Sequence, residues 1–532
     1  MSSNSLLLRL AIAGMVGVYV YLALDSHLYW HEGRLLYAVS HFSIAELIQG
    51  HVNTNQVGAE INTLSSSGYH LTKILYLVVL KGLTALPVAT DLQLLIGSLV
   101  SLAAIIACAW CVRGTMRALG ADDKAANWSM AAFALMPVMP YLAGKLLSET
   151  TAILPMCLAM YLWSRSLRPI EKAIGPKHLA AGVLVAVTAL ARLDFVIVPV
   201  GFIVATLAVA DTGTRVRLLR THGFVAVVAG TLYLATILSV HGSFDSIYYY
   251  LSNYLALTPK SILMSVFGVA SFAGLMWLFA VLGSFCAGKL SRLLIIWLAA
   301  ALLPVMVIVS NYMIEPRYLV AASMPLAGLA GMGISRLVHH RQPVLLTRIV
   351  IVAIASISVL NAVLIVLMPY EIERKDILRI VDDYVPEGSD GTLLVPYFYS
   401  DFHFLRFARP MTEILNVYAP DGDPAKVSPE WDERLRDWYG DRYVTDPAVI
   451  DRILVGGHAY YLGWGVYPPI ETMEHWAKML GMEWLRERLA ELGLEEHSAQ
   501  SWLWNSPRYA LSPVARYGQY TLYAVTSADA SP

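Results

Sequence analysis

Apolar and polar residues divide this chain into long alternating segments. Eleven apolar runs, each long enough or nearly long enough to cross the roughly 30 Å hydrocarbon core of a bilayer as a helix, occur before residue 369. They lie near residues 6–24, 91–111, 127–142, 150–164, 178–191, 195–210, 223–240, 263–285, 293–309, 318–335 and 349–368. This pattern predicts a polytopic α-helical membrane protein with about 11 transmembrane helices.

The topology depends on a twelfth candidate, residues 69–88, which His70, Lys73 and Lys81 interrupt. If it does not cross, most Lys and Arg fall in loops on one side, which the positive-inside rule assigns to the cytoplasm. These loops are residues 112–126, 165–177, 211–222, 286–292 and 336–348. If residues 69–88 cross the membrane, every later loop changes side, and most Lys and Arg would then lie outside. We therefore expect a cytoplasmic amino terminus and an extracytoplasmic carboxyl-terminal domain, in a bacterial inner (plasma) membrane.

Pattern and charge both change near residue 369. Residues 1–369 hold 23 Lys and Arg against 13 Asp and Glu, whereas residues 370–532 hold 15 against 26. The later part contains the expected strands GTLLVPYF, HAYYLGWG and QYTLYAVTS, and an amphipathic helix at residues 471–493. We predict a transmembrane domain at 1–368 with a large outer first loop at 25–90, and an extracytoplasmic soluble α/β domain at 369–532.

Composition supports this division. The chain is 57% hydrophobic and only 14% charged, whereas soluble globular domains carry roughly a quarter charged residues. An ordinary soluble protein is excluded.

The predicted topology puts several charged side chains at helix ends on the outer side. Polar groups at a membrane boundary are costly unless water or a partner meets them, so they are functional candidates. They include Asp25, His31, Glu32, Glu149, Arg192, Asp194 and Arg317. We also expect residues 33–49 to form a short interfacial helix, because Leu35, Leu36, Val39 and Phe42 share one face.

Four short motifs resemble those of one enzyme class, in the same order. WHEGRLLYA is similar to an acidic pair followed by a short helix after helix one, and LLSETTAILPMCLAMYLW to a second outer acidic position, matched by Glu149. ARLDF resembles an Arg-containing turn, and EPRYLVAASMPL the Arg-Tyr start of a late helix. Together they resemble the GT-C class of integral-membrane glycosyltransferases, which includes protein O-mannosyltransferases and lipid A aminoarabinose transferases.

The resemblance covers residues 1–368 in layout and implies an enzyme that takes a sugar from a polyprenyl-phosphate carrier. Such transfer needs a base for the proton of the acceptor and cations for the departing phosphate. Glu32 and Asp25 are the candidates for the base, and His31 stands where the class usually has an acid. Candidates for the donor phosphate are Arg317, Arg192, Lys260 and His70.

Other roles for these residues stay open. Glu32 could pair with Arg34, Asp25 and Glu149 could cap helices, and Arg192 could form a structural ion pair with Asp194. No cofactor is certain, but a divalent metal ion at His31 and Glu32 is an alternative, because some members of the class use one.

The expected partners are a polyprenyl-phosphate-linked sugar donor, membrane lipids, and an acceptor that is a glycan, a lipid or a protein. No nucleic-acid partner is expected. Two rival functions remain: a lipid or sugar transporter or flippase, and an inactive binding protein with the same fold.

Overall fold

The computed structural model divides the chain into two compact units. The first unit comprises Met1–Ser26 and Gly68–Val366, and the second comprises His27–Ser67 and Leu367–Pro532. Apart from a few isolated positions, the structure describes residues 30–44, 73–167, 174–241, 272–286, 288–308, 316–339, 374–386, 391–396, 400–419, 439–464, 501–504, 506–517 and 520–528.

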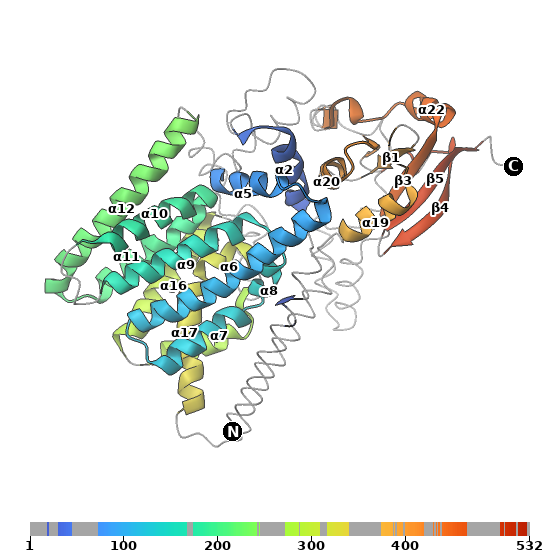
Figure 1. Ribbon diagram of the computed structural model, residues 1–532. Helices are drawn as coiled ribbons and strands as arrows, with labels where there is room; N and C mark the ends of the chain where they lie inside the picture. Colours follow the sequence, from blue (N-terminus) through green and yellow to red (C-terminus); the bar gives the residue numbers. More distant parts are fainter. Residues whose placement is uncertain are drawn as a thin grey trace. The chain divides into compact units, whose positions relative to one another are not determined.

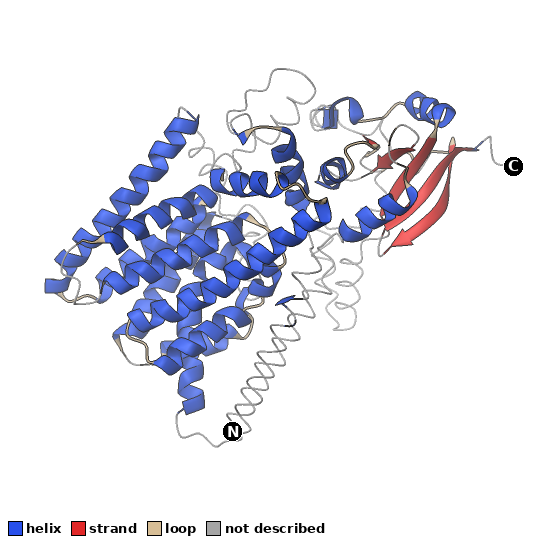
Figure 2. Ribbon diagram, viewed as in Figure 1, coloured by secondary structure: helices blue, strands red, loops and turns tan. Residues whose placement is uncertain are grey.

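The first unit is a bundle of helices (Figures 1 and 2). Helix α9 packs against α10, which follows it in sequence, and against the earlier helix α6, and α10 also packs against α12. The helices are α5 (Ile74–Thr84), α6 (Thr90–Ala118), α7 (Asp123–Leu135), α8 (Val138–Ala143), α9 (Ser148–Ser166), α10 (Pro176–Ala191), η1 (Leu193–Val196), α11 (Ile197–Val209), α12 (Thr212–His241), α15 (Met276–Ser284), α16 (Lys289–Ile308), η2 (Pro316–Ala322) and α17 (Ser323–His339).

Three helices among the described residues are long and apolar enough to cross a bilayer by length and composition. They are Leu92–Ala118, Thr212–Val240 and Leu319–Val338. Helix α5 is much shorter: its 11 residues rise only about 16 Å, roughly half of the hydrocarbon core. The expectation that residues 69–88 do not cross stays a prediction, because other predicted spanning segments, such as α7 and α11, are also short, with 13 residues each.

The single run predicted at residues 127–142 is two helices. Helix α7 ends at Leu135, where Met136 takes an extended conformation before Pro137, and α8 follows. The cause is steric, because a proline disfavours helical backbone in the residue that precedes it.

Glycines allow α17 to approach its neighbours closely. A Cβ atom added at Gly333 would meet the Phe279 carbonyl oxygen on α15, and one added at Gly331 would meet Ser129 on α7. Gly283 of α15 is in the same relation to the Leu329 carbonyl oxygen of α17. Small residues at such contacts are typical of helices that associate within a membrane.

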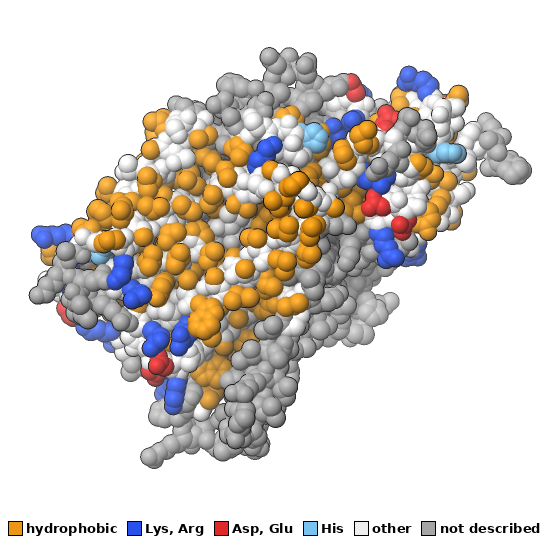
Figure 3. Space-filling view, in the orientation of Figure 1, with side chains coloured by type: hydrophobic (Ala, Val, Ile, Leu, Met, Phe, Trp, Pro, Cys, Tyr) orange, Lys and Arg blue, Asp and Glu red, His pale blue; other side chains and the backbone are white. Residues whose placement is uncertain are grey.

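Apolar side chains cover much of the visible surface of the first unit, and charged ones gather at its margins (Figure 3). On α12, Val227 is 66% exposed and Leu219 is 56% exposed. Lipid tails can contact such a surface at no cost, whereas water cannot.

The second unit contains a five-stranded mixed sheet in the order β2-β1-β3-β5-β4. Strand β1 pairs in parallel with β2 and β3, and β5 pairs antiparallel with β3 and β4. Strands β1, β3 and β5 coincide with the three that the sequence predicts, whereas the predicted helix at 471–493 lies outside the described residues. The elements are α2 (Trp30–His41), α19 (Arg374–Tyr384), β1 (Gly391–Val395), α20 (Ser400–Ala408), β2 (Glu413–Asn416), η5 (Gly440–Arg442), α22 (Pro447–Gly456), β3 (His458–Trp464), β4 (Tyr509–Tyr517) and β5 (Tyr520–Ser527).

Helices cover both faces of this sheet. On one face, Leu393 and Val395 of β1 pack with Ile380 of α19 and Phe402 of α20. On the other face, Leu394 packs in a core that includes Ile450 of α22. The alternation along β1 follows from the two-residue period of a strand.

Helix α2 corrects the first part of the expected interfacial helix at residues 33–49, of which residues 45–49 lie outside the described residues. It begins at Trp30, ends at His41 and packs against α20 of the second unit. Leu35, Leu36 and Val39 are buried there in protein. An apolar face with helical spacing fits a membrane surface and a protein partner equally well, so the pattern could not choose between them.

Candidate functional site

The start of α9 and the end of α10 lie together in the first unit, because the two helices pack as neighbours along the chain. Helix α9 begins at Ser148, and its first turn is capped through Thr150, whose Oγ1 accepts from the Leu147 N–H at 2.9 Å. Glu149 is therefore not needed as the cap that the sequence left open. Its carboxylate contacts Arg192 instead.

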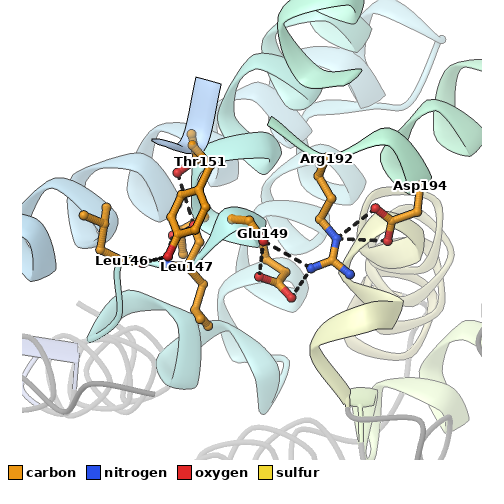
Figure 4. A network of polar contacts seen from close by, with 9 residues as sticks. Leu146, Leu147, Glu149, Thr151, Arg192 and Asp194 are labelled. Atoms are coloured by element: carbon orange, nitrogen blue, oxygen red, sulfur yellow. Dashed lines mark hydrogen bonds and ion pairs between the residues drawn. The ribbon is translucent and has the colours of Figure 1, made fainter. Parts of the chain in front are cut away.

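Arg192 marks the point where the chain leaves α10. Its backbone is extended, and the short helix η1 follows directly. Its guanidinium lies between two carboxylates (Figure 4): Nε donates to Asp194 Oδ1 and Oδ2 at 2.8 and 2.9 Å, and Nη1 pairs with Glu149 Oε1. We call Glu149, Arg192 and Asp194 the ionic cluster.

The ionic cluster is almost closed to solvent. The side chains of Glu149 and Arg192 are 1% and 3% exposed, and that of Asp194 is 9% exposed. Ser148 Oγ donates to the second carboxylate oxygen of Glu149 at 3.1 Å, and the Arg192 guanidinium lies 5.8 Å from the centre of the Phe195 ring. Desolvated charges of this kind are costly unless they are paired, which explains the dense pairing.

Two buried lysines belong to the same region, and the sequence did not single them out as site residues. Lys145 is 3% exposed and precedes α9, and its carbonyl accepts from Thr150 Oγ1. Lys73 is 5% exposed and precedes α5, whose Tyr76 donates from its hydroxyl to the Leu146 carbonyl at 2.9 Å. The available signal was position: Lys73 interrupts an apolar run, and Lys145 stands four residues before Glu149.

These residues stand out in the described part of the first unit. There, the buried Asp, Glu, Lys and Arg residues are Lys73, Lys145, Glu149 and Arg192. Counted with Asp194, these residues comprise three basic and two acidic side chains.

The other candidates are less fully described. His31 and Glu32 lie in the first turns of α2, and Arg317 lies in η2, with only their backbone described. Asp25, His70 and Lys260 lie outside the described residues. Where side chains are described, no three His, Cys, Asp or Glu residues gather as ligands for a metal ion.

A scan against protein families finds no match for the sequence, and neither does a search of curated proteins. Solved structures do match. The crystal structure of ArnT from Cupriavidus metallidurans bound to undecaprenyl phosphate aligns with a TM-score of 0.55 and 14% identity, over 98% of this chain and 98% of that chain. This chain has the ArnT fold. The apo ArnT structure aligns with a TM-score of 0.52 and 13% identity, again over 98% of both chains.

The ArnT fold confirms the resemblance to the GT-C class and the prediction of a polytopic, integral membrane protein. At this level of identity the likeness shows the fold alone. The number of 11 spanning helices stays a prediction.

Proposed function

We propose that this protein is a membrane glycosyltransferase that moves a sugar from a polyprenyl-phosphate carrier to an acceptor on the extracytoplasmic face. The observation that carries the proposal is the buried ionic cluster with its two neighbouring lysines, in a chain with the fold of a structure that binds undecaprenyl phosphate. The comparisons do not favour the transporter alternative.

The charges of this region fit a lipid-linked phosphate. A phosphate that departs with growing negative charge needs cations fixed nearby, and the region has more cations than carboxylates. We propose Lys145 and Lys73 as phosphate contacts, in addition to Arg317, Lys260 and His70. Arg192 already serves two carboxylates, so we propose that it positions the first turn of α9.

The proposed reaction is a direct displacement. The acceptor hydroxyl or amine attacks the anomeric carbon, the bond from that carbon to the phosphate oxygen breaks, and polyprenyl phosphate leaves with the electron pair. The acceptor proton passes to a carboxylate, for which Glu32 and Asp25 are our candidates. The bonds and protons of this displacement balance without a metal ion. A divalent ion at His31 and Glu32 remains the alternative.

The test uses the full-length protein in lipid nanodiscs with a labelled polyprenyl-phosphate sugar. We expect transfer by the wild type and its loss in Glu32→Gln or Asp25→Asn, with donor binding retained. Asp211→Asn is the control, because Asp211 is 76% exposed, where it pairs with Lys289. Full activity in both carboxylate variants would remove the proposed bases, and donor binding without any transfer would select the inactive binding protein.

We also propose that the amino terminus is cytoplasmic and that residues 369–532 are extracytoplasmic. Reporter fusions after residues 80 and 120 test this arrangement. We expect residue 80 outside and residue 120 in the cytoplasm. The reverse at residue 120 would contradict the topology.

A further inference from the structure

Helix α2 is enclosed on every side along its centre. Five consecutive residues, Leu35 to Val39, are each no more than 4% exposed. Successive residues in an α-helix are turned by about 100°, so five of them pass all the way round the axis. A helix that merely rested on a surface would leave part of this circumference exposed.

Among the described elements, α2 packs against α20, which is itself anchored to the sheet. Phe402 and Leu405 of α20 are fully buried in the core that contains Leu393 and Val395 of β1. Arg406, the next residue, is directed at α2 instead. Its guanidinium carbon lies 4.4 Å from the centre of the Tyr37 ring, within the range of a cation–π contact.

The contact continues along α2. The rings of Tyr37 and His41 lie 4.2 Å apart between their centroids, and His41 Nδ1 lies 3.0 Å from the Tyr37 carbonyl oxygen. Arg406 also lies 5.6 Å from the Phe402 ring, so one guanidinium joins an aromatic ring of α20 to one of α2. This stack links α2 to the core of the second unit.

We propose that Arg406 is a positioning residue for the transfer reaction: through Tyr37 it holds α2 in place, and with α2 the turn that carries His31 and Glu32. This inference rests on the proposed function, in which Glu32 is a candidate base. Glu32 precedes Tyr37 by five residues, about 7.5 Å along the helix axis. Residues of the second unit that follow residue 366 therefore position Glu32, which the sequence pattern assigns to the first outer loop of the membrane domain.

The experiment joins steady-state kinetics to hydrogen exchange on the full chain in nanodiscs. In Arg406→Ala we expect kcat to fall roughly 10- to 100-fold, because small displacements of a catalytic group are that costly, and KM for the donor to stay unchanged. Amide exchange in residues 35–41 should become roughly threefold faster while the sheet stays protected.

Conservative variants separate positioning from general stability. Arg406→Lys keeps the cation and Tyr37→Phe keeps the ring, so both should retain kcat within about threefold. Tyr37→Leu keeps apolar bulk without the ring and should behave like Arg406→Ala, which gives a second test if that variant fails to fold. Arg452→Ala, an exposed arginine on α22, is the matched control and should change neither readout.

The outcomes distinguish this inference from the proposed function. Unchanged kcat in Arg406→Ala and Tyr37→Leu, with an active wild type, would overturn the positioning role. Unchanged exchange in α2 would overturn it as well, whether or not transfer is detected. A wild type without transfer, but with faster α2 exchange in Arg406→Ala, would contradict the proposed function and leave the link between α20 and α2 standing.

Discussion

Helix α9 carries two buried polar groups of opposite kind, one near each end. Glu149 in its first turn belongs to the ionic cluster, in which charges pair with charges. Trp163, about 21 Å further along the helix, belongs to a neutral cluster with Thr206 of α11 and His222 of α12, which we call the histidine cluster.

Hydrogen bonds connect the residues of the histidine cluster. Trp163 Nε1 donates to His222 Nδ1 at 3.1 Å, so the proton of the neutral imidazole is on Nε2. That proton faces Thr206 Oγ1 at 2.8 Å, and the threonine hydroxyl donates in turn to the Phe202 carbonyl at 2.8 Å. The chain of donors ends on the backbone, and no charge enters it.

The difference between the two clusters indicates a structural role for the histidine cluster and a functional role for the ionic cluster. A neutral cluster whose donors all find acceptors stabilises the contact of three helices, and this structural role accounts for it fully. An ionic cluster in an apolar bundle is seldom more stable than apolar packing, so its retention favours a functional role. Four substitutions test this contrast, in order of expected effect.

Glu149→Ala should have the largest effect. Arg192 would keep Asp194 but lose the more deeply buried of its two carboxylate partners, and we expect a destabilisation of about 2–3 kcal/mol together with a loss of transfer of about 100-fold or more. Thermal unfolding in detergent and the transfer assay measure the two effects. The exposed Asp211→Ala should change little, and a similar loss in that control would contradict the special role of the ionic cluster.

Arg192→Lys should have a smaller effect, because it keeps the charge but not the fork of donors. One ammonium group cannot satisfy Glu149 and Asp194 with the geometry of a guanidinium. We expect transfer to fall about tenfold with a milder loss of stability. Equal activity in the lysine variant would show that charge alone suffices.

Trp163→Phe should lower stability without touching transfer. The phenyl ring keeps most of the packing against Phe202, whereas His222 Nδ1 loses its donor. The expected cost is about 1–2 kcal/mol by thermal unfolding, the range for a buried group left unsatisfied. A selective loss of transfer at unchanged stability would place the histidine cluster in the mechanism.

Thr206→Val should have the smallest effect. It nearly preserves shape and removes the hydroxyl that connects His222 to the Phe202 carbonyl. About 1 kcal/mol of stability should be lost, again with normal transfer. If Thr206→Val and Trp163→Phe add without coupling, the two bonds do not form one network.

Much of this fold follows from pattern. The apolar runs between residues 91 and 335 predict helices of the bundle, and the alternating segments after residue 390 predict β1, β3 and β5. The runs at 6–24 and 349–368 lie outside the described residues, apart from isolated positions. The order of charged residues along the chain also put Glu149, Arg192 and Asp194 on one side, where the structure brings them into contact. The sequence left open whether Arg192 forms an ion pair within the protein, and the structure shows that it pairs with Glu149 and Asp194.

The features that the sequence did not predict are those that depend on contacts between residues far apart in the chain. The sequence around Leu36 and Tyr37 does not predict their contact with α20, which follows more than 350 residues later. Lys145 resembles an ordinary loop lysine until its burial is known. Local pattern gives the face that a helix buries, whereas tertiary packing decides what covers it.

The glycines of α17 have a mechanical consequence. Where α17 crosses α15, backbone meets backbone, because Gly333 faces the Phe279 carbonyl oxygen and Gly283 faces the Leu329 carbonyl oxygen. A side chain larger than hydrogen at either glycine would therefore have to push one helix away from the other.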